Sequence, residues 1–258
     1  MLRHLTMHGL PITIAGDSQE LGRAAARRFA EVLARVIAEK GRASVILATG
    51  NSQLPFVRAL VDEPDIDWSS VTVFHMDEYL GMSAEHPASF RRWLKEHIVD
   101  PFSPKSFYGV DGDAEPIEAE LERYSQLLEQ EDPDITVMGI GENGHLAFND
   151  PPADFETPDL IHVVQLDHAC RMQQVGEGHF PNLEATPTQA LSLTIPMLLR
   201  PRTVLVLVPE QRKAVATARA LEGPVTPDCP ASFLQTVSNA ELYLDAESAS
   251  RLTVPAEG

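Results

Sequence analysis

Short runs of consecutive apolar residues alternate along this chain with longer stretches in which apolar residues recur every three or four positions. The short runs are typical of strands, and the longer stretches are typical of helices with one buried face. Because the run at 44–48 does not alternate between apolar and polar residues, we expect a strand buried on both faces in a parallel sheet. The whole pattern predicts a doubly wound, Rossmann-like α/β fold with a mostly parallel sheet and helices on both faces. The predicted strands are 11–15, 44–48, 71–74, 135–138 and 204–208, and the predicted helices are 18–40, 54–60, 88–98, 117–130 and 212–221.

The predicted first helix has recognisable ends. Asp17 or Ser18 can accept a hydrogen bond from the first turn, and Gly41 can end the helix in a left-handed conformation. A chain of 258 residues with this regular alternation is expected to form one domain over residues 1–258. Residues 151–187 are polar, interrupted by prolines and weakly periodic, which is typical either of a flap over a site or of a plain surface excursion.

Composition narrows the possible partners. The formal net charge of −18 argues against binding to nucleic acids or anionic membranes, because no segregated basic patch offsets it. No run of apolar residues approaches the roughly 18 needed to span a membrane, and residues 1–9 lack the apolar core of a signal peptide. We therefore expect a cytoplasmic protein.

The two cysteines, Cys170 and Cys229, are too few for a disulfide framework or a cysteine-based metal cluster. Free cysteines of this kind are usually buried thiols that behave as small apolar residues. The sequence therefore predicts no metal site.

A glycine-rich polar turn, Gly139 to Pro152, follows the predicted strand at 135–138. Open α/β sheets bind their ligands at the C-terminal ends of strands, and glycine lets the backbone approach a ligand closely. Within this turn, His145 supplies a titratable imidazole, and Asn143 and Asp150 supply oxygen atoms that can hold it. The combination indicates an acid–base site, although this short pattern alone also fits an ordinary turn with a surface histidine.

Two other predicted strand ends carry polar residues. Thr49, Gly50, Asn51 and Ser52 lie between a strand and a helix, and their hydroxyl and backbone N–H groups suit a phosphate, while the Gly-Lys-Ser/Thr ending of a nucleotide-binding loop is absent. The same loop also fits an ordinary strand–helix turn.

Asp77 and Glu78 follow the strand at 71–74. Neighbouring side chains in extended backbone point to opposite sides, so only one of these carboxylates can face a given ligand, where it can act as a base.

Several motifs follow one another along the chain: Thr49-Gly50, Met76-Asp77-Glu78-Tyr79-Leu80-Gly81, His86-Pro87-Ala88-Ser89-Phe90, Gly139 to Pro151 and Pro230-Ala231-Ser232-Phe233-Leu234-Gln235. In their order and spacing, from about residue 45 to 235, the chain resembles the glucosamine-6-phosphate deaminase family. The broader superfamily includes 6-phosphogluconolactonases, in which a hydroxyl residue and a Ser-Leu-Phe-Pro run usually follow the Gly-His pair. The segment 146–151 is instead similar to the deaminase form.

The resemblance implies conversion of an amino-sugar 6-phosphate and water to a ketose 6-phosphate and ammonia, without a metal or an organic cofactor. It implies that Asp77 moves a proton between C2 and C1 of the sugar and that His145 assists ring opening. Asn143 and Asp150 would orient His145. The implied substrate-binding residues are Thr49, Gly50, Asn51, Ser52, Glu78, Gly144 and the phosphate-binding Lys213. Many members of the family form homo-oligomers, so a homo-oligomer is expected here.

The chain departs from the family pattern at several places. Asn143 and Asp150 stand where many members have aspartate and glutamate, and the loop 48–53 reads Ala-Thr-Gly-Asn-Ser-Gln instead of Pro-Thr-Gly-Gly-Thr-Pro. Arg171 lies near the place of a phosphate-contacting arginine, but the surrounding segment does not resemble the usual Asn-Ser-Arg-Phe-Phe form. Loss of a bidentate arginine would weaken phosphate binding or change the substrate.

Three functions follow from these observations. The leading hypothesis is a deaminase acting on glucosamine 6-phosphate or a stereoisomer such as galactosamine 6-phosphate. The second is a phosphosugar lactonase in which His145 activates water and Asp77 has no role in proton transfer at carbon. The third is a sugar-phosphate sensor without catalytic activity, which the altered segment around Arg171 and the shorter Asp150 make conceivable.

Overall fold

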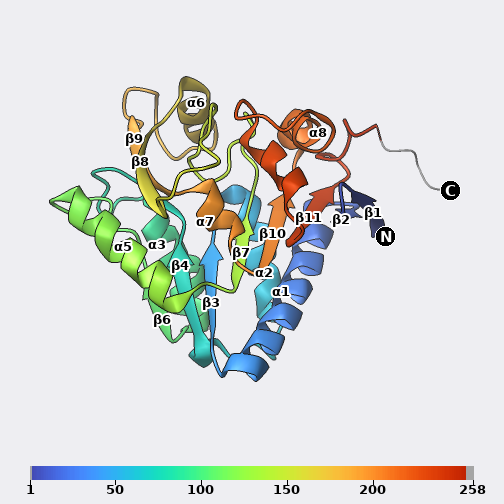
Figure 1. Cartoon of the computed structure of the whole chain (residues 1–258), viewed down its shortest axis with the longest axis horizontal. Helices are drawn as coiled ribbons and strands as arrows, with labels where there is room; N and C mark the ends of the chain where they lie inside the picture. The colour runs from blue at the N-terminus through green and yellow to red at the C-terminus, as the bar shows by residue number, and fades with distance from the viewer. Residues whose placement is uncertain (1, 254–258) are drawn as a thin grey trace.

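An eight-stranded sheet forms the centre of the molecule in the computed structural model, which describes residues 2–253 (Figure 1). All strands pair in parallel except β1, which forms an antiparallel hairpin with β2. This arrangement confirms the predicted mostly parallel α/β sheet. In spatial order the strands are β1 (Arg3–Met7), β2 (Leu10–Ala15), β11 (Ala240–Asp245), β10 (Thr203–Val208), β7 (Ile135–Met138), β3 (Ala43–Leu47), β4 (Val71–His75) and β6 (Ser106–Tyr108).

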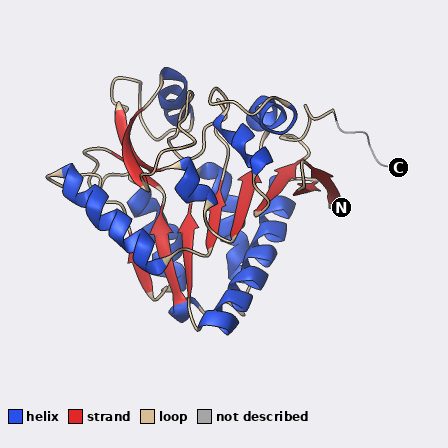
Figure 2. Cartoon of the chain, in the orientation of Figure 1, coloured by secondary structure: helices blue, strands red, loops and turns tan. Residues whose placement is uncertain are grey.

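Helices cover both faces of this sheet, as the doubly wound pattern predicts (Figure 2). One face packs against α1 (Ser18–Lys40), α2 (Leu54–Ala59) and the segment that begins with α3 (Phe90–Leu94). The other face packs against α5 (Ile117–Glu131), α7 (Ile195–Leu199) and α8 (Ala214–Glu222). Strand β3 is buried along its whole length, which explains its continuous apolar run.

Helix α1 has the predicted ends. The Asp17 side chain accepts a hydrogen bond of 2.7 Å from the backbone N–H of Glu20. At the other end, Gly41 adopts the left-handed conformation with φ of 72°, and its N–H donates to the carbonyl of Ile37. These contacts satisfy backbone groups that have no partner inside the helix, so the helix boundaries were predictable from local sequence.

A second, antiparallel sheet of β5 (Asp77–Tyr79), β9 (Gln189–Leu193) and β8 (Ile161–Gln165) lies beside the C-terminal ends of the main strands. Helix α6 (His168–Gly176) lies next to it, and Figure 2 shows the arrowheads of the central strands pointing toward this side. A separate apolar cluster, which includes Tyr79, Phe148 and Cys170, joins the second sheet to α6. The segment 151–187 therefore contains a strand and a helix that pack on the body of the protein.

Several elements differ from the sequence prediction. Strands β6 and β11 of the central sheet, the three strands of the second sheet and helices α6 and α7 were not predicted. Strand β1 was not predicted, because its side chains are mostly polar or exposed. It pairs with β2 through a tight turn in which His8 and Gly9 have φ of 52° and 80°. The predicted helix at 88–98 begins at Phe90, because Ser89 caps it by accepting from the N–H of Arg92. It continues through a π-helical turn, Lys95–Val99, into α4 (Asp100–Phe102).

Among the described residues, no helix is both long and apolar enough to cross a membrane.

Candidate active site

A cavity lies where the C-terminal ends of four neighbouring strands, β10, β7, β3 and β4, meet helix α6. This is the edge at which parallel α/β sheets bind ligands. The structure brings most of the predicted residues together in the cavity wall although they are far apart in the sequence. The predicted residues that line the cavity are Thr49, Gly50, Asn51, Ser52, Asp77, His145 and Lys213.

The loop after β3 and the buried Lys213 form one end of the cavity. Asn51 and Ser52 begin a one-turn 3₁₀ helix, so their N–H groups have no partner inside that turn. Gly50 has φ of 92°, which lets the loop bend there without strain. Lys213 follows β10 and is 3% exposed, and burial lowers the pKa of its ammonium. Because its Nζ has no hydrogen bond or ion pair within residues 2–253, this end is suited to an anion.

Asp77 is a buried carboxyl in the cavity wall. It lies at the start of β5, directly after β4, and is 7% exposed. Burial, with a smaller contribution from the charge of Glu78, raises its pKa to about 8. A carboxyl group with a pKa in this range is suited to take up and return a proton near neutral pH.

Glu78 does not line the cavity, which corrects its expected role in substrate binding. Its carboxylate accepts hydrogen bonds from the Ser89 hydroxyl at 2.7 Å and from the N–H of Arg91 at 2.9 Å. Burial raises the pKa of Glu78, and these hydrogen bonds partly offset that rise. Because side chains alternate along β5, Asp77 faces the cavity while Glu78 holds the beginning of α3.

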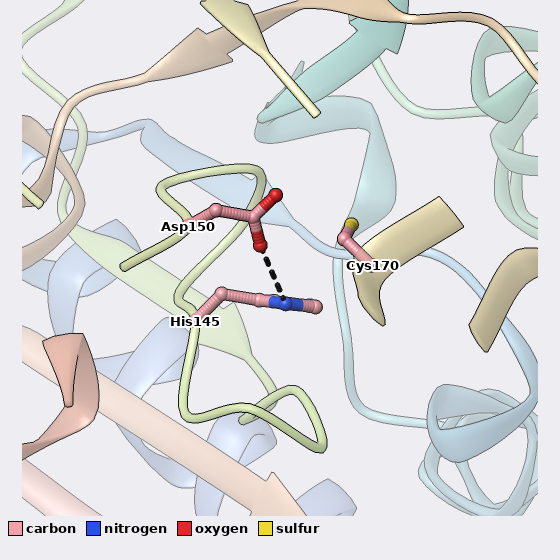
Figure 3. A group of neighbouring side chains, drawn as sticks. All are labelled: His145, Asp150 and Cys170. Carbon is pink, nitrogen blue, oxygen red and sulfur yellow. Dashed lines mark ion pairs between the residues drawn. The ribbon is translucent and has the colours of Figure 1, made fainter. Parts of the chain in front are cut away.

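His145 enters the cavity from the loop after β7, and Asp150 lies directly behind it (Figure 3). Nδ1 of His145 is 3.2 Å from Oδ1 of Asp150, although their orientation does not give a hydrogen bond. Burial alone would raise the pKa of Asp150, but the contact with His145 and hydrogen bonds from Asn143 and Asp167 outweigh it and leave the pKa below its ordinary value. Asp150 is therefore a carboxylate that can stabilise a protonated imidazole.

Asn143 and Asp150 act on His145 from outside the cavity lining. The amide of Asn143 donates to Oδ1 of Asp150 at 3.0 Å, and its oxygen accepts from the N–H of His145 at 3.0 Å. Oδ2 of Asp150 accepts from the N–H of Asp167, the residue that caps α6. Although Asp150 is shorter than the glutamate that many family members have at this position, its carboxylate reaches His145. The same carboxylate links the loop after β7, which carries His145, to α6.

Glycines make room for this arrangement. The ring of His145 lies so close to Gly141 that a Cβ there would be 2.2 Å from the ring atoms. Gly144 has φ of 93° and faces Cys229, and its carbonyl accepts from the N–H of Ala231. Gly144 does not line the cavity, which corrects its expected contact with substrate. It shapes the turn, while the segment that contains Ala231 supports it.

Arg171 does not reach the cavity. Its guanidinium donates to the carbonyls of Leu183 and Thr186 and so stabilises the loop after α6. The segment 151–187 therefore does not place an arginine at the phosphate-suited end in the described structure. This agrees with the difference in sequence between the segment and the usual family form.

Helix α6 and the residues after it form one wall of the cavity. In place of an arginine, this wall carries side-chain amides and an ion pair. Gln173, Gln174, Glu177 and His179 line the cavity. Glu177 lies 2.7 Å from Arg212 and 3.4 Å from His179. Burial by itself would raise the pKa of Glu177, but His179 and Arg212 outweigh burial and lower it to about 2. This wall therefore presents a carboxylate that stays ionised at neutral pH.

These four residues were not predicted from the sequence, because their segment has little periodicity in its apolar positions and contains no recognisable motif. Gln53, whose side-chain oxygen is buried without a hydrogen-bond partner in the described structure, was not predicted either. In the sequence, Gln53 differs from the family pattern in one respect, because it stands where the family usually has proline. Cys170 was expected to be a plain buried thiol, yet it offers a possible metal ligand next to His145 and Asp150. Burial, followed in importance by the charge of Asp150, raises the pKa of its thiol.

Comparison with known proteins identifies the family. Residues 16–243 match the family described as glucosamine-6-phosphate isomerases/6-phosphogluconolactonase. The chain belongs to this family. The match covers all the strand ends that form the cavity, so the cavity is part of the shared domain.

Glucosamine-6-phosphate deaminases from two streptococci are similar to this chain over most of its length. The enzyme from Streptococcus pneumoniae serotype 4 is 35% identical over 222 residues, which cover 86% of this chain and 93% of the relative. The enzyme from Streptococcus suis is 38% identical over 206 residues, which cover 80% of this chain and 86% of the relative. Both relatives match over most of their own length as well.

Solved structures agree with the family fold. A structure described as a monomeric glucosamine-6-phosphate deaminase superposes with a TM-score of 0.84 at 30% identity and covers 93% of this chain and 99% of that one. A 6-phosphogluconolactonase from Shewanella baltica superposes with a TM-score of 0.71 at 21% identity, covering 91% of this chain and 97% of that one. The second likeness shows the shared fold alone.

Proposed function

We propose that this protein is an amino-sugar 6-phosphate deaminase that converts glucosamine 6-phosphate, or a stereoisomer of it, and water to a ketose 6-phosphate and ammonia. The observation that carries the proposal is the convergence of Asp77 and His145 in one cavity whose end is suited to a phosphate. The curated relatives with this name support the same reaction.

In this proposal the cavity binds the phosphate through Lys213 and the loop of Thr49, Gly50, Asn51 and Ser52. The sugar then extends from that end toward Asp77 and His145. The bound phosphate fixes the position of the sugar, which brings the reacting carbons near the acid–base groups.

His145 exchanges a proton with the ring oxygen, and the ring opens. Asp77 then takes the proton from C2 and returns it to C1, which converts the amino aldose to the imine of a ketose. Water adds to the imine carbon, and the carbon–nitrogen bond breaks to release ammonia. Asp150 supports His145 in its protonated state, because its carboxylate lies 3.2 Å from the imidazole.

The test is to incubate purified protein with glucosamine 6-phosphate and, in parallel, galactosamine 6-phosphate, and to measure both ammonia and ketose 6-phosphate. We expect both products in equal amounts from one sugar. Asp77→Asn removes the base, so turnover should fall by about 100- to 10,000-fold while thermal unfolding changes little. Asp113→Asn, which changes a carboxylate that pairs with Arg91 away from the cavity, is the matched control.

The other two functions are distinguishable outcomes of the same experiment. Hydrolysis of a 6-phosphogluconolactone without ammonia release would assign the chain to the lactonase reaction. A rise in melting temperature with phosphosugars but no turnover of any of them would assign it to a sensor role. Full turnover by Asp77→Asn would contradict Asp77 as the base.

We further infer a cytoplasmic, cofactor-independent enzyme that assembles as a homo-oligomer, in keeping with the family resemblance. The solved deaminase that superposes on this chain is described as monomeric, which makes a monomer the alternative. Light scattering on the purified chain during size-exclusion chromatography decides between them, and a mass equal to one chain would rule out the oligomer.

A further inference from the structure

Three side chains with different metal-binding atoms meet behind the wall of the cavity. His145 and Asp150 come from the loop after β7, and Cys170 comes from α6 (Figure 3). One ligand atom from each residue lies within 4.8 Å of the other two. The cluster therefore brings together the loop after β7 and helix α6 through a nitrogen, an oxygen and a sulfur atom.

A second observation concerns hydrogen bonding in this cluster, where one buried nitrogen atom makes no hydrogen bond. His145 is only 8% exposed, and its Nδ1 makes no hydrogen bond within the described structure although Asp150 lies 3.2 Å away. A buried ring nitrogen with an ion-pair contact but no hydrogen bond is uncommon, and it leaves a lone pair or a proton available for a further interaction. It lies in the same cluster as the Cys170 sulfur and the Asp150 carboxylate.

We propose that His145, Asp150 and Cys170 form an inhibitory binding site for a divalent zinc ion. Imidazole, thiolate and carboxylate are the ligands that zinc prefers, and three protein ligands leave the fourth position of a tetrahedral ion to water. Magnesium and calcium prefer sites made of oxygen atoms alone, so the thiol of Cys170 selects against them.

The distances require a small adjustment. With bonds of about 2.0 Å to nitrogen or oxygen and about 2.3 Å to sulfur, the three ligand atoms of a tetrahedral ion lie roughly 3.3–3.5 Å apart. The separation of 3.2 Å between His145 and Asp150 is already near that range. The sulfur of Cys170 lies within 4.8 Å of the other two ligand atoms. It must therefore approach by at most about 1.3 Å, which a rotation of its side chain or a slight shift of α6 supplies.

The charges near the cluster favour a cation. Within residues 2–253, neither lysine nor arginine forms an ion pair with Asp150, and the carboxylate of Asp167 lies beside it through their shared partner Asn143. Binding forms a metal–sulfur bond, breaks the S–H bond of Cys170 and releases that proton to solvent. No oxidant or reductant is needed.

Zinc at this site would inhibit the enzyme for a geometric reason. A ring nitrogen of His145 that binds the ion can no longer exchange protons freely, and Asp150 is withdrawn from supporting the imidazole. The ion would also fix α6, and with it Gln173 and Gln174, against the histidine loop.

The experiment uses cobalt(II) as a coloured substitute for zinc in the full chain after chelator treatment. A thiolate bound to cobalt gives a sulfur-to-metal charge-transfer absorption, which reports the metal–sulfur bond without any need for enzymatic turnover. We expect one equivalent of cobalt to produce this band, and zinc to remove it by displacing the cobalt. The same preparations are then assayed for inhibition by zinc, each relative to its own rate without metal.

The chain offers a matched control, because Cys229 is the other buried cysteine and lies outside the cluster. Cys170→Ser and Cys170→Ala should both lose the band, while Cys229→Ser should retain it. Asp150→Asn should weaken cobalt binding by at least about tenfold. Thermal unfolding of each variant verifies that the protein tested is folded.

A folded wild-type protein without the band would overturn the site, as would a band that persists in both Cys170 variants or disappears in Cys229→Ser. Equal inhibition by zinc of the wild type and of Cys170→Ser would overturn the inhibitory role. If no amino sugar is turned over, the deaminase proposal fails, but the cobalt spectrum still decides whether the metal site exists.

Discussion

Asp77, which is buried, and Glu177, whose side chain is 9% exposed, line the same cavity, yet the pKa values of their carboxyl groups move in opposite directions. Burial raises the pKa of Asp77 to about 8, and the neighbouring charge of Glu78 adds to that rise. Burial also acts to raise the pKa of Glu177, but His179 and Arg212 lie against it and bring the value to about 2. The difference arises from the partners of each group, because both are removed from water.

The cavity accordingly has two kinds of wall. The wall made by strand ends contains Asp77 and Lys213, which have no hydrogen-bond or ion-pair partner among residues 2–253 and are available to a ligand. The wall made by α6 and the residues after it contains a paired carboxylate, Glu177, whose charge is already balanced by the protein. Titratable groups whose environments drive their pKa values apart usually have different roles. We therefore assign chemistry to the first wall and substrate selection to the second.

The pH dependence of the first wall is the largest effect expected without a substitution. Asp77 must be ionised to accept a proton, and its pKa is raised, so kcat/KM should rise with pH and level off above about pH 8. Well below that value it should fall by about tenfold for each pH unit, so that at pH 6 it lies about 100-fold below its plateau. Steady-state kinetics from about pH 6 to about pH 9 measures this profile.

Glu177 provides the contrast within the same experiment. Because its pKa lies near 2, it stays ionised throughout this range and should contribute no step to the profile. Glu177→Gln should therefore keep the same inflection as the wild type. A profile that is flat from pH 6 to pH 8 would contradict the assignment of Asp77 as the titrating base.

Lys213→Met tests the anion-binding end of the first wall. A hydrogen bond to a charged group contributes about 1.5–3 kcal/mol, so kcat/KM should fall by roughly 10- to 100-fold, mainly through KM. Lys95→Met, which changes an exposed lysine paired with Asp100, should leave both constants unchanged. Inhibition by inorganic phosphate should weaken in parallel with KM, and an unchanged phosphate affinity would show that Lys213 does not bind the phosphate.

Much of the first wall could be predicted from the sequence, because each of its residues follows an apolar strand. The strand ends at Thr49, Asp77 and His145 converge as a parallel sheet requires. The second wall could not be predicted, because Glu177 and His179 belong to a weakly periodic segment whose position depends on packing of Cys170 and Phe180 in a separate apolar cluster.

The sequence also could not fix which way each side chain points. Glu78 and Gly144 belong to the same motifs as Asp77 and His145, but the structure gives them supporting roles. Strand alternation predicted that Asp77 and Glu78 face opposite sides, but it could not say which one faces the cavity. Register against β9 settles this, and that pairing depends on residues more than 100 positions away.

Asp150→Asn tests the link between the two walls, because Asp150 contacts His145 and accepts from the N–H of Asp167 at the start of α6. Loss of its negative charge should lower kcat by about tenfold and leave KM nearly unchanged, since the group acts through His145. Asp150→Glu restores the charge and should recover part of the rate. Equal losses in both variants would indicate that Asp150 serves packing alone.

The smallest expected effect concerns the second wall. Glu177→Gln removes a negative charge near the phosphate-suited end and frees Arg212 from its 2.7 Å ion pair, so KM for the phosphosugar should fall by about threefold. Glu184→Gln, which changes an exposed carboxylate in the same segment, is the matched control and should leave KM unchanged. If Glu177→Gln raised KM instead, Glu177 would be needed to hold the α6 wall in place, and substrate selection would have to be assigned to Gln173 and Gln174, the amides of the same wall.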